Sequence, residues 1–327
     1  MLISAILAGS GAIFYGSSES LAPSQYVEIR MYHNRNQLKK DTFRVMTYNI
    51  GYLSGMTNNL PVKRERALFS KNLNSAAQLI NTSKPDIIGF QEIDFNSDRT
   101  YGFNQLDSLA ILCDYNHAAS IINWDKKYVP FPFWPPSMHF AGILSGQSIL
   151  TNGTITQTER VVLPRPESKS FLYNAFYIDR IIQITKLRLT EYEIYVMNVH
   201  LEAFDQRTRE KQGKIVRSYF EKLSSKYPVL LIGDFNAEPF DLNNTTDSTM
   251  AYILGSNDIK HAYDKASYEA NPTHHYTFSS EDPRYKIDYI LYNPSKIQPV
   301  HYEVMDEAKY ISDHLPVQMD FVLLNAE

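Results

Sequence analysis

The sequence of 327 residues contains a single cysteine, Cys113, and no apolar run long enough to cross a bilayer. Without a second cysteine the chain forms no intramolecular disulfide, which excludes the small secreted folds that disulfides hold together. Cys113 lies in an apolar stretch, which indicates an inert core residue. The longest apolar stretch, residues 2–15, is shorter than the roughly 20 residues that a membrane-spanning helix needs.

The chain also lacks an excess of positive charge. Lysine and arginine number 32 against 36 aspartate and glutamate, so the formal net charge is −4. Proteins that hold DNA without regard to sequence bind its phosphates through clustered lysine and arginine, so the composition weighs against that class. Repeats and flexible linkers are absent as well. We therefore expect one large domain over residues 42–325, preceded by an N-terminal apolar segment and lead-in at residues 1–41.

The N-terminal segment has two readings. Its apolar stretch at residues 2–15 is followed by Gly16, Ser17 and Ser18, as in the hydrophobic region of a signal peptide. The first basic residue is Arg30, so the positive charge that normally precedes such a region is missing. We favour an exported or membrane-anchored protein and keep a cytoplasmic location, with this segment packed on the domain, as the alternative.

Alternating strands and helices follow the lead-in. Stretches rich in valine, isoleucine, phenylalanine and tyrosine predict strands at residues 41–50, 85–93, 193–201 and 228–235. Apolar residues at helical spacing predict helices at residues 61–82 and 205–226.

Polar residues able to bind a metal ion or to move a proton follow six apolar stretches in order along the chain. They are Asn49, Glu92, His200, Asp234 with Asn236, Asp288, and Asp313 with His314. Each alone has an ordinary explanation, such as a turn after a strand or a half-buried histidine. Because strand ends meet at one edge of a sheet, we expect the whole set to line one cleft. Oxygen ligands without cysteine suit Mg²⁺, with Mn²⁺ able to substitute, and histidines suit proton transfer on a phosphate ester.

The ordered set of motifs resembles the endonuclease/exonuclease/phosphatase superfamily. The most specific matches are Asn-Val-His-Leu at residues 198–201, Gly-Asp-Phe-Asn at residues 233–236 and Ser-Asp-His-Leu-Pro at residues 312–316. The resemblance covers about residues 42–325, which it identifies as a catalytic domain. It implies an α+β fold, a four-layer αββα sandwich of two mixed β-sheets flanked by helices.

The resemblance also implies a metal site. Glu92 would be the principal Mg²⁺ carboxylate, with Asn49 beside it and Asp313 completing the site.

The remaining residues would carry the chemistry. Asp234 and Asn236 would orient the attacking water and the scissile phosphate. His314 would be the base, with Asp288 fixing its tautomer. His200 would stabilise the transition state or protonate the leaving oxygen.

We expect a metal-dependent hydrolase that acts on ester bonds, either a phosphodiesterase or a phosphatase. The lead substrate is a lipid head group or another small phosphoester, and we expect a monomer. A deoxyribonuclease-like nuclease shares all the motifs and is the first alternative. A catalytically silent binding module on the same fold is the second. His200 disfavours an abasic-site endonuclease, because that branch of the superfamily carries a different residue there.

Residues 127–140 form the most unusual segment, with three phenylalanines, a tryptophan and four prolines. So many prolines exclude a regular helix. Two interpretations remain open. The segment is a rigid aromatic lip that contacts substrate or membrane through Phe131, Phe133 and Trp134, or it is a loop folded onto its own sheet.

Overall fold

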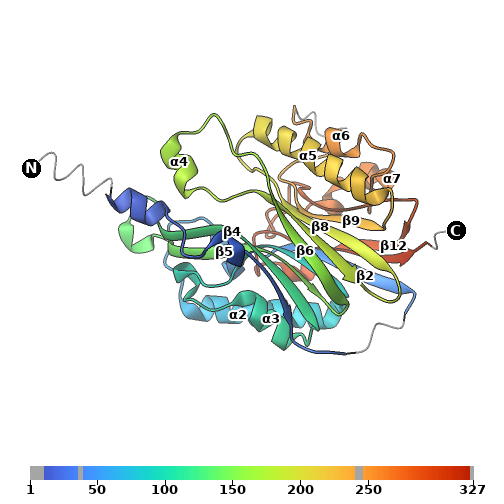
Figure 1. Cartoon of the computed structure of the whole chain (residues 1–327), viewed down its shortest axis with the longest axis horizontal. Helices are drawn as coiled ribbons and strands as arrows, with labels where there is room; N and C mark the ends of the chain where they lie inside the picture. The colour runs from blue at the N-terminus through green and yellow to red at the C-terminus, as the bar shows by residue number, and fades with distance from the viewer. Residues whose placement is uncertain (1–10, 36–39, 240–245, 325–327) are drawn as a thin grey trace, which may run out of the picture.

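Two β-sheets packed face to face form the centre of the molecule, and helices cover the outer face of each sheet (Figure 1). The computed structural model of the chain describes residues 11–35, 40–239 and 246–324. Each sheet contains parallel and antiparallel strand pairs. The expected α+β, four-layer αββα sandwich of two mixed sheets is therefore confirmed.

The seven-stranded sheet has the order β1-β4-β5-β3-β2-β13-β12. In it β2 and β3 are parallel, and β2 also pairs antiparallel with β13. Its strands are β1 (Val27–Met31), β2 (Thr42–Asn49), β3 (Ile87–Asp94), β4 (His117–Val129), β5 (Ala141–Thr151), β12 (Ile297–Val304) and β13 (Val317–Leu323).

The six-stranded sheet has the order β10-β11-β9-β8-β7-β6. In it β8 and β9 are parallel, and β9 pairs antiparallel with β11. Its strands are β6 (Thr154–Val162), β7 (Ile181–Arg188), β8 (Glu193–His200), β9 (Val229–Asp234), β10 (Lys260–His261) and β11 (Asp288–Tyr292).

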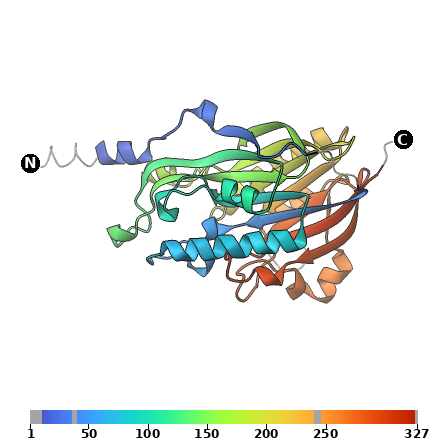
Figure 2. The same cartoon turned by 90° about the horizontal axis from the view of Figure 1, so that it is seen from below.

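Helices α2 and α3 cover the seven-stranded sheet, and α5 and α6 cover the six-stranded one (Figures 1 and 2). The predicted helix at residues 61–82 begins later, at Arg66. Arg64 donates to the carbonyls of Thr57 and Leu60, which holds the preceding residues in a turn. The helices are α2 (Arg66–Ser83), α3 (Gln105–Leu112), α4 (Phe171–Phe176), α5 (Gln206–Ser224), α6 (Thr249–Leu254) and α7 (Lys265–Ala270).

Three apolar layers hold the four layers of structure together. The alternation of side chains along each strand produces them. On β2, Phe43 and Val45 pack between the two sheets, whereas Met46 and Tyr48 pack under the helices on the outer face. The third apolar layer lies between the six-stranded sheet and helices such as α5, and includes Phe220.

A buried layer of amides interrupts the apolar contact between the sheets. Asn198 on β8 accepts a hydrogen bond from Gln91 of the other sheet at 2.6 Å and donates to the Phe90 carbonyl at 3.0 Å. Gln147 donates to the Asn198 carbonyl at 2.9 Å. Buried amides need such partners, so these bonds fix how one sheet lies on the other.

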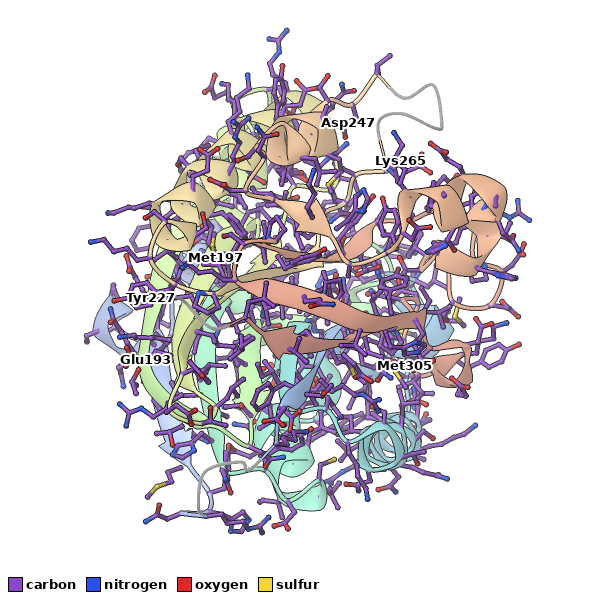
Figure 3. All side chains as sticks on the ribbon, turned by 90° about the vertical axis from the view of Figure 1, so that its right-hand side faces the viewer. Glu193, Met197, Tyr227, Asp247, Lys265 and Met305 are labelled. Carbon is purple, nitrogen blue, oxygen red and sulfur yellow. The ribbon has the colours of Figure 1, made fainter. Side chains whose placement is uncertain are left out.

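The parallel pairs point their carboxyl ends toward one end of the sandwich. Figure 3 shows the opposite end, where Glu193 begins β8 and Tyr227 precedes β9. His200 and Asp234, at the other ends of these strands, are register partners. The topology thus gathers the predicted site residues at one edge, as the sequence analysis expected.

The N-terminal lead-in contributes to the fold. Its strand β1 pairs with β4 at the edge of the seven-stranded sheet, and residues 11–17 form a helix. The rest of the predicted apolar segment, residues 1–10, lies outside the described residues. No helix within the described ranges combines the length and hydropathy that crossing a bilayer requires.

Gly233 on β9 provides a test of how closely β9 lies against β8. Its φ is +143°, and a Cβ there would lie 1.9 Å from the Val199 carbonyl oxygen. Gly233→Ala is therefore expected to lower the free energy of unfolding by at least about 1–3 kcal/mol, measured by urea denaturation. Gly11→Ala is the control, since nothing lies within 4 Å of a Cβ at that position. Equal midpoints for Gly233→Ala and the unmodified chain would contradict the expectation.

Candidate active site

The structure brings all eight predicted site residues together at the common edge of the two sheets. Asn49 is the junction, because its Nδ2 lies 3.3 Å from Glu92 Oε1, 2.9 Å from Asp234 Oδ2 and 3.4 Å from His314 Nε2. His200 Nε2 lies 3.4 Å from Asp234 Oδ2. The other three, Asp288, Asp313 and Asn236, contact these residues directly or through one side chain, as described below.

Glu92 and Asp313 form a pair of carboxylates around one amide. Asn58 Nδ2 lies 3.3 Å from Glu92 Oε2 and 3.2 Å from both carboxylate oxygens of Asp313. Burial, with the charge of Glu92, raises the pKa of Asp313. Among the described residues no lysine or arginine pairs with either carboxylate within 4.0 Å. Two close carboxylates without a cation fit a divalent metal ion, which prefers such oxygen ligands.

The side-chain amide of Asn49 is not oriented as that of a metal ligand would be. Its Oδ1 accepts a hydrogen bond from the Gly51 N–H at 3.1 Å, and its amide nitrogen faces the carboxylates. The carboxylate of Asp234 accepts from that nitrogen, which favours this placement of the amide. In this arrangement Asn49 orients Asp234, and ligation of a metal by its oxygen would require the amide to turn over.

His314 and Asp288 form a hydrogen-bonded dyad. His314 Nδ1 lies 3.0 Å from Asp288 Oδ2, and its Nε2 lies 3.8 Å from Asp234 Oδ2. Burial disfavours the charged imidazole, but Asp288 and Asp234 outweigh it and raise the pKa of His314 well above its usual value. Burial also raises the pKa of Asp234 to about 7, against the opposing charge of His314. Both shifts favour the protonated forms of these two side chains.

The oxygen and nitrogen atoms of Asp234, Asp288 and His314 also lie within 4.8 Å of one another, a spacing that a metal ion can occupy. The dyad already occupies one atom of Asp288 and one of His314. Glu92 and Asp313, by contrast, have only the amide of Asn58 between them. The described residues thus offer two settings for a cation, the Glu92–Asp313 pair and the group of Asp234, Asp288 and His314.

His200 is also buried, but its surroundings shift its pKa in the direction opposite to that of His314. Burial, together with the positive charge of Arg180, lowers the pKa of His200 well below its usual value. The pKa values of His200 and His314 are thus shifted in opposite directions. Neighbouring groups whose environments separate their pKa values in this way are typical of sites that move protons.

Arg180 was not predicted from the sequence. It precedes β7, and its side chain is 5% exposed. Its Nη2 donates to the Tyr177 hydroxyl at 3.2 Å, and its Nε lies 3.7 Å from Glu202. Nε and Nη1 of this guanidinium have no hydrogen-bond partner among the described residues. Buried arginine donors that lack partners fit a phosphate or another anion.

A backbone irregularity directs Glu92 into the site. The pairing of β3 with β5 shifts register between Phe90 and Ile93, and Glu92 has a φ of +51°. A bulge of this kind turns a side chain away from the normal alternation. The sequence contains no signal for it, because no glycine marks the position.

Asn236 lies just past the end of β9. Its N–H donates to Asp234 Oδ1 at 2.9 Å, and its Nδ2 donates to the Leu201 carbonyl at 3.0 Å. These two bonds hold the side chain of Asn236 beside the end of β8.

Solved structures share the fold. An endonuclease/exonuclease/phosphatase from Beutenbergia cavernae is 19% identical, with a TM-score of 0.65 over 88% of this chain and 73% of that chain. The human nocturnin catalytic domain is 18% identical, with a TM-score of 0.60 over 93% and 100%. The mannosyl-6-phosphatase of Bacteroides thetaiotaomicron is 18% identical, with a TM-score of 0.59 over 86% and 99%.

At these identities the structural likeness establishes the fold alone. No curated protein sequence matches the chain. The sequence model of the Endonuclease/Exonuclease/phosphatase family matches residues 46–314, which include all eight predicted site residues. Since this match spans most of the sequence, the chain belongs to the endonuclease/exonuclease/phosphatase family.

Proposed function

We propose that the protein is a metal-dependent phosphoesterase that hydrolyses a phosphodiester or a phosphomonoester by in-line attack of water. The proposal rests on one observation: carboxylates suited to a metal ion and a histidine–aspartate group suited to proton transfer lie together at the common edge of the two sheets. The carboxylates of Glu92 and Asp313, which no lysine or arginine of the described residues contacts within 4.0 Å, lie beside Asp234, His314 and Asp288.

The metal has a defined chemical part. Glu92 and Asp313 would hold Mg²⁺, which when bound supplies positive charge that polarises the phosphoryl group. Mn²⁺ is expected to substitute, since it accepts the same oxygen ligands.

The protein's own residues position and deprotonate the water. Asp234 and Asn236 orient it, and its proton passes to the group formed by Asp234 and His314. Asp288 holds Nδ1 of His314, so the imidazole presents Nε2 to the site. The new bond joins the water oxygen to phosphorus, while the bond to the leaving oxygen breaks and that oxygen takes up a proton.

Two further residues would stabilise the charge that develops on phosphorus. The partner-free N–H groups of Arg180 are suited to bind non-bridging phosphate oxygens. His200, beside Asp234, would donate a hydrogen bond to the phosphoryl group, and its lowered pKa disfavours it as the proton donor to the leaving oxygen. Fixed donors of this kind contribute more when the charge is present only in the transition state.

The preferred substrate is a lipid head group or another small phosphoester. The formal charge of −4 disfavours a long polyanion as substrate. One structural neighbour is named as a mannosyl-6-phosphatase, which supports testing a phosphomonoester beside a diester.

A substrate panel tests the proposal. The full chain is incubated with bis(p-nitrophenyl) phosphate, p-nitrophenyl phosphate, vesicles that contain sphingomyelin or phosphatidylinositol phosphates, and plasmid DNA, each with and without Mg²⁺. We expect Mg²⁺-dependent hydrolysis of a small or lipid phosphoester, with ¹⁸O from labelled water appearing in the product that retains phosphorus.

Two results would overturn it. Cleavage of plasmid DNA alone, falling steeply as salt rises, would identify a nuclease, because counterion release governs such binding. Failure on every phosphoester with either Mg²⁺ or Mn²⁺ would instead support a silent binding module.

A further inference from the structure

The most exposed aromatic rings of the molecule belong to segments at one end. Phe14, Phe133, Trp134, Phe171 and Phe204 are the aromatic side chains with the largest exposed fractions among the described residues, at 80%, 81%, 78%, 82% and 72%. The next is Tyr15, at 62%, on the same helix as Phe14. Exposed rings are costly in water, and a group of them at one end marks a surface that meets another phase or partner.

Three of the segments surround the edge that carries the site. Strands β4 and β5 stay paired past the level of Glu92, as far as Val129 and Ala141, so the connection at residues 130–140 projects beyond this edge. Helix α4 lies in the connection from β6 to β7, which begins level with the end of β8. Phe204 follows β8 directly.

Hydrogen bonds tie the helix at residues 11–17 and α4 to the β4–β5 hairpin. Lys126 Nζ donates to the Ser17 carbonyl at 2.9 Å, and the Lys127 N–H donates to the Ser18 carbonyl at 3.0 Å. Trp124 Nε1 donates to the Phe176 carbonyl at 2.9 Å. Figure 1 shows the N-terminal helix, this hairpin and α4 at the same end of the sandwich.

The 130–140 connection divides its aromatic residues between the core and the solvent. Phe131 is half-buried, with its ring 5.3 Å from the buried ring of Phe140. Phe131 thus anchors the loop. Of the three residues predicted to contact substrate or membrane, only Phe133 and Trp134 are exposed. The interpretation as a loop folded onto its own sheet therefore holds for Phe131 and Phe140, and the contact of Phe133 and Trp134 with substrate or membrane stays a prediction.

We infer that this face, defined as Phe14, Phe133, Trp134, Phe171 and Phe204, docks on a phospholipid bilayer and presents the site to head groups at the membrane surface. The inference rests on the proposed function, whose substrate class it narrows to a phosphoester at a lipid–water interface. Aromatic rings favour that interface over either water or hydrocarbon.

The surroundings of the face fit a lipid surface better than a protein partner. Lys127 and Lys169 are exposed beside it, with their ammonium groups 5.4 Å from the rings of Tyr15 and Tyr173. Such cations attract anionic phospholipids. Glu167, in the same connection, is paired with Lys211 at 2.9 Å. The sequence of residues 2–9, which leads to this face, is free of charge.

Vesicle binding by the full chain tests the inference without relying on catalysis. Phosphatidylcholine vesicles, with and without phosphatidylglycerol, are sedimented with the protein, and the bound fraction is measured in EDTA. Phe133→Ser with Trp134→Ser, and separately Phe171→Ser with Leu172→Ser, should each lower vesicle affinity at least about tenfold, since each removes the apolar burial of two large side chains. The matched control is Ile111→Ser with Leu112→Ser, an adjacent exposed pair on α3, which should leave binding within about twofold.

Fluorescence gives a second readout. The sequence has two tryptophans, and Trp124 is only partly exposed, whereas Trp134 is 78% exposed. Vesicles should therefore shift the emission to shorter wavelength, and the shift should disappear in the variant that lacks Trp134. Vesicle binding that resists both double substitutions, or that the control weakens equally, overturns the inference.

The outcomes separate the two proposals. Hydrolysis of a soluble phosphoester without vesicle binding removes the docking face and leaves the proposed function. Vesicle binding without hydrolysis of any phosphoester removes the proposed function and leaves the docking face. If vesicles do not bind and the Phe133/Trp134 substitutions convert a dimer into a monomer in sedimentation velocity, the face joins two copies of the chain and the lipid assignment is wrong.

Discussion

His314→Ala is expected to lower kcat by about 10²–10⁴-fold, with a smaller change in KM. The imidazole is the only group in the described site that contacts both Asp234 and Asp288. Its loss removes the path for the water's proton and leaves the buried carboxylates of Asp234 and Asp288 without the imidazole that contacts both. Steady-state kinetics on the best substrate of the panel measures the change.

Three comparisons make this result specific. Asp288→Asn, which keeps the hydrogen-bonding shape but removes the charge, should lower kcat less than His314→Ala does. His301→Ala should leave kcat unchanged, because that histidine lies on β12 and pairs with Glu303. Melting curves must show that the His314 variant is folded. Unchanged turnover in a folded His314→Ala variant would mean that this dyad does not move the proton.

Removal of divalent cations is expected to abolish hydrolysis, and added Mg²⁺ is expected to restore it. A bound metal contributes several kcal/mol of charge stabilisation in phosphoryl transfer, so we expect the loss to reach at least about 10³-fold. Glu92→Gln should act in the same direction by halving the negative charge of the Glu92–Asp313 pair. It should raise the Mg²⁺ concentration needed for half-maximal activity.

Metal binding provides a readout that does not depend on turnover. Titration calorimetry with Mn²⁺ should show weaker binding by the Glu92→Gln variant than by the unmodified chain. Glu159→Gln is the control, since Glu159 is an exposed carboxylate on β6. Full activity in excess EDTA would refute the metal requirement. Equal Mn²⁺ affinity in Glu92→Gln would move the metal to the group formed by Asp234, Asp288 and His314.

The strands that carry the site were predictable because their sequences are short stretches rich in valine, isoleucine, phenylalanine and tyrosine. The predicted strand at residues 228–235 is β9 in the structure, with side chains buried throughout. The positions of Glu92, His200 and Asp234 relative to these strands followed from the motifs. Their convergence followed from the rule that parallel strands end at a common edge.

Other features depended on contacts between distant residues. Asn58 lies in a loop, and only the fold brings it between Glu92 and Asp313. Arg180 became a candidate only because its side chain is buried and two of its nitrogens lack hydrogen-bond partners among the described residues. Neither property can be read from the sequence. The strand β1 lies within the predicted lead-in and was not predicted, because its partner residues on β4 are 86–94 positions away in the sequence.

The buried amide layer sets a condition for any attempt to recombine this protein with a relative. Apolar contact between sheets has no direction, so two sheets joined by it alone tolerate small displacements. A hydrogen bond weakens steeply when its geometry is lost, and Asn198 makes four of them to the opposite sheet.

Gln91 adjoins Glu92, and Asn198 lies two residues before His200 on β8. The same bonds therefore align the proposed metal carboxylates with the residues proposed to move protons. A chimera that takes one sheet from each parent would keep its apolar packing yet lose this alignment unless both partners of the Gln91–Asn198 bond come with it.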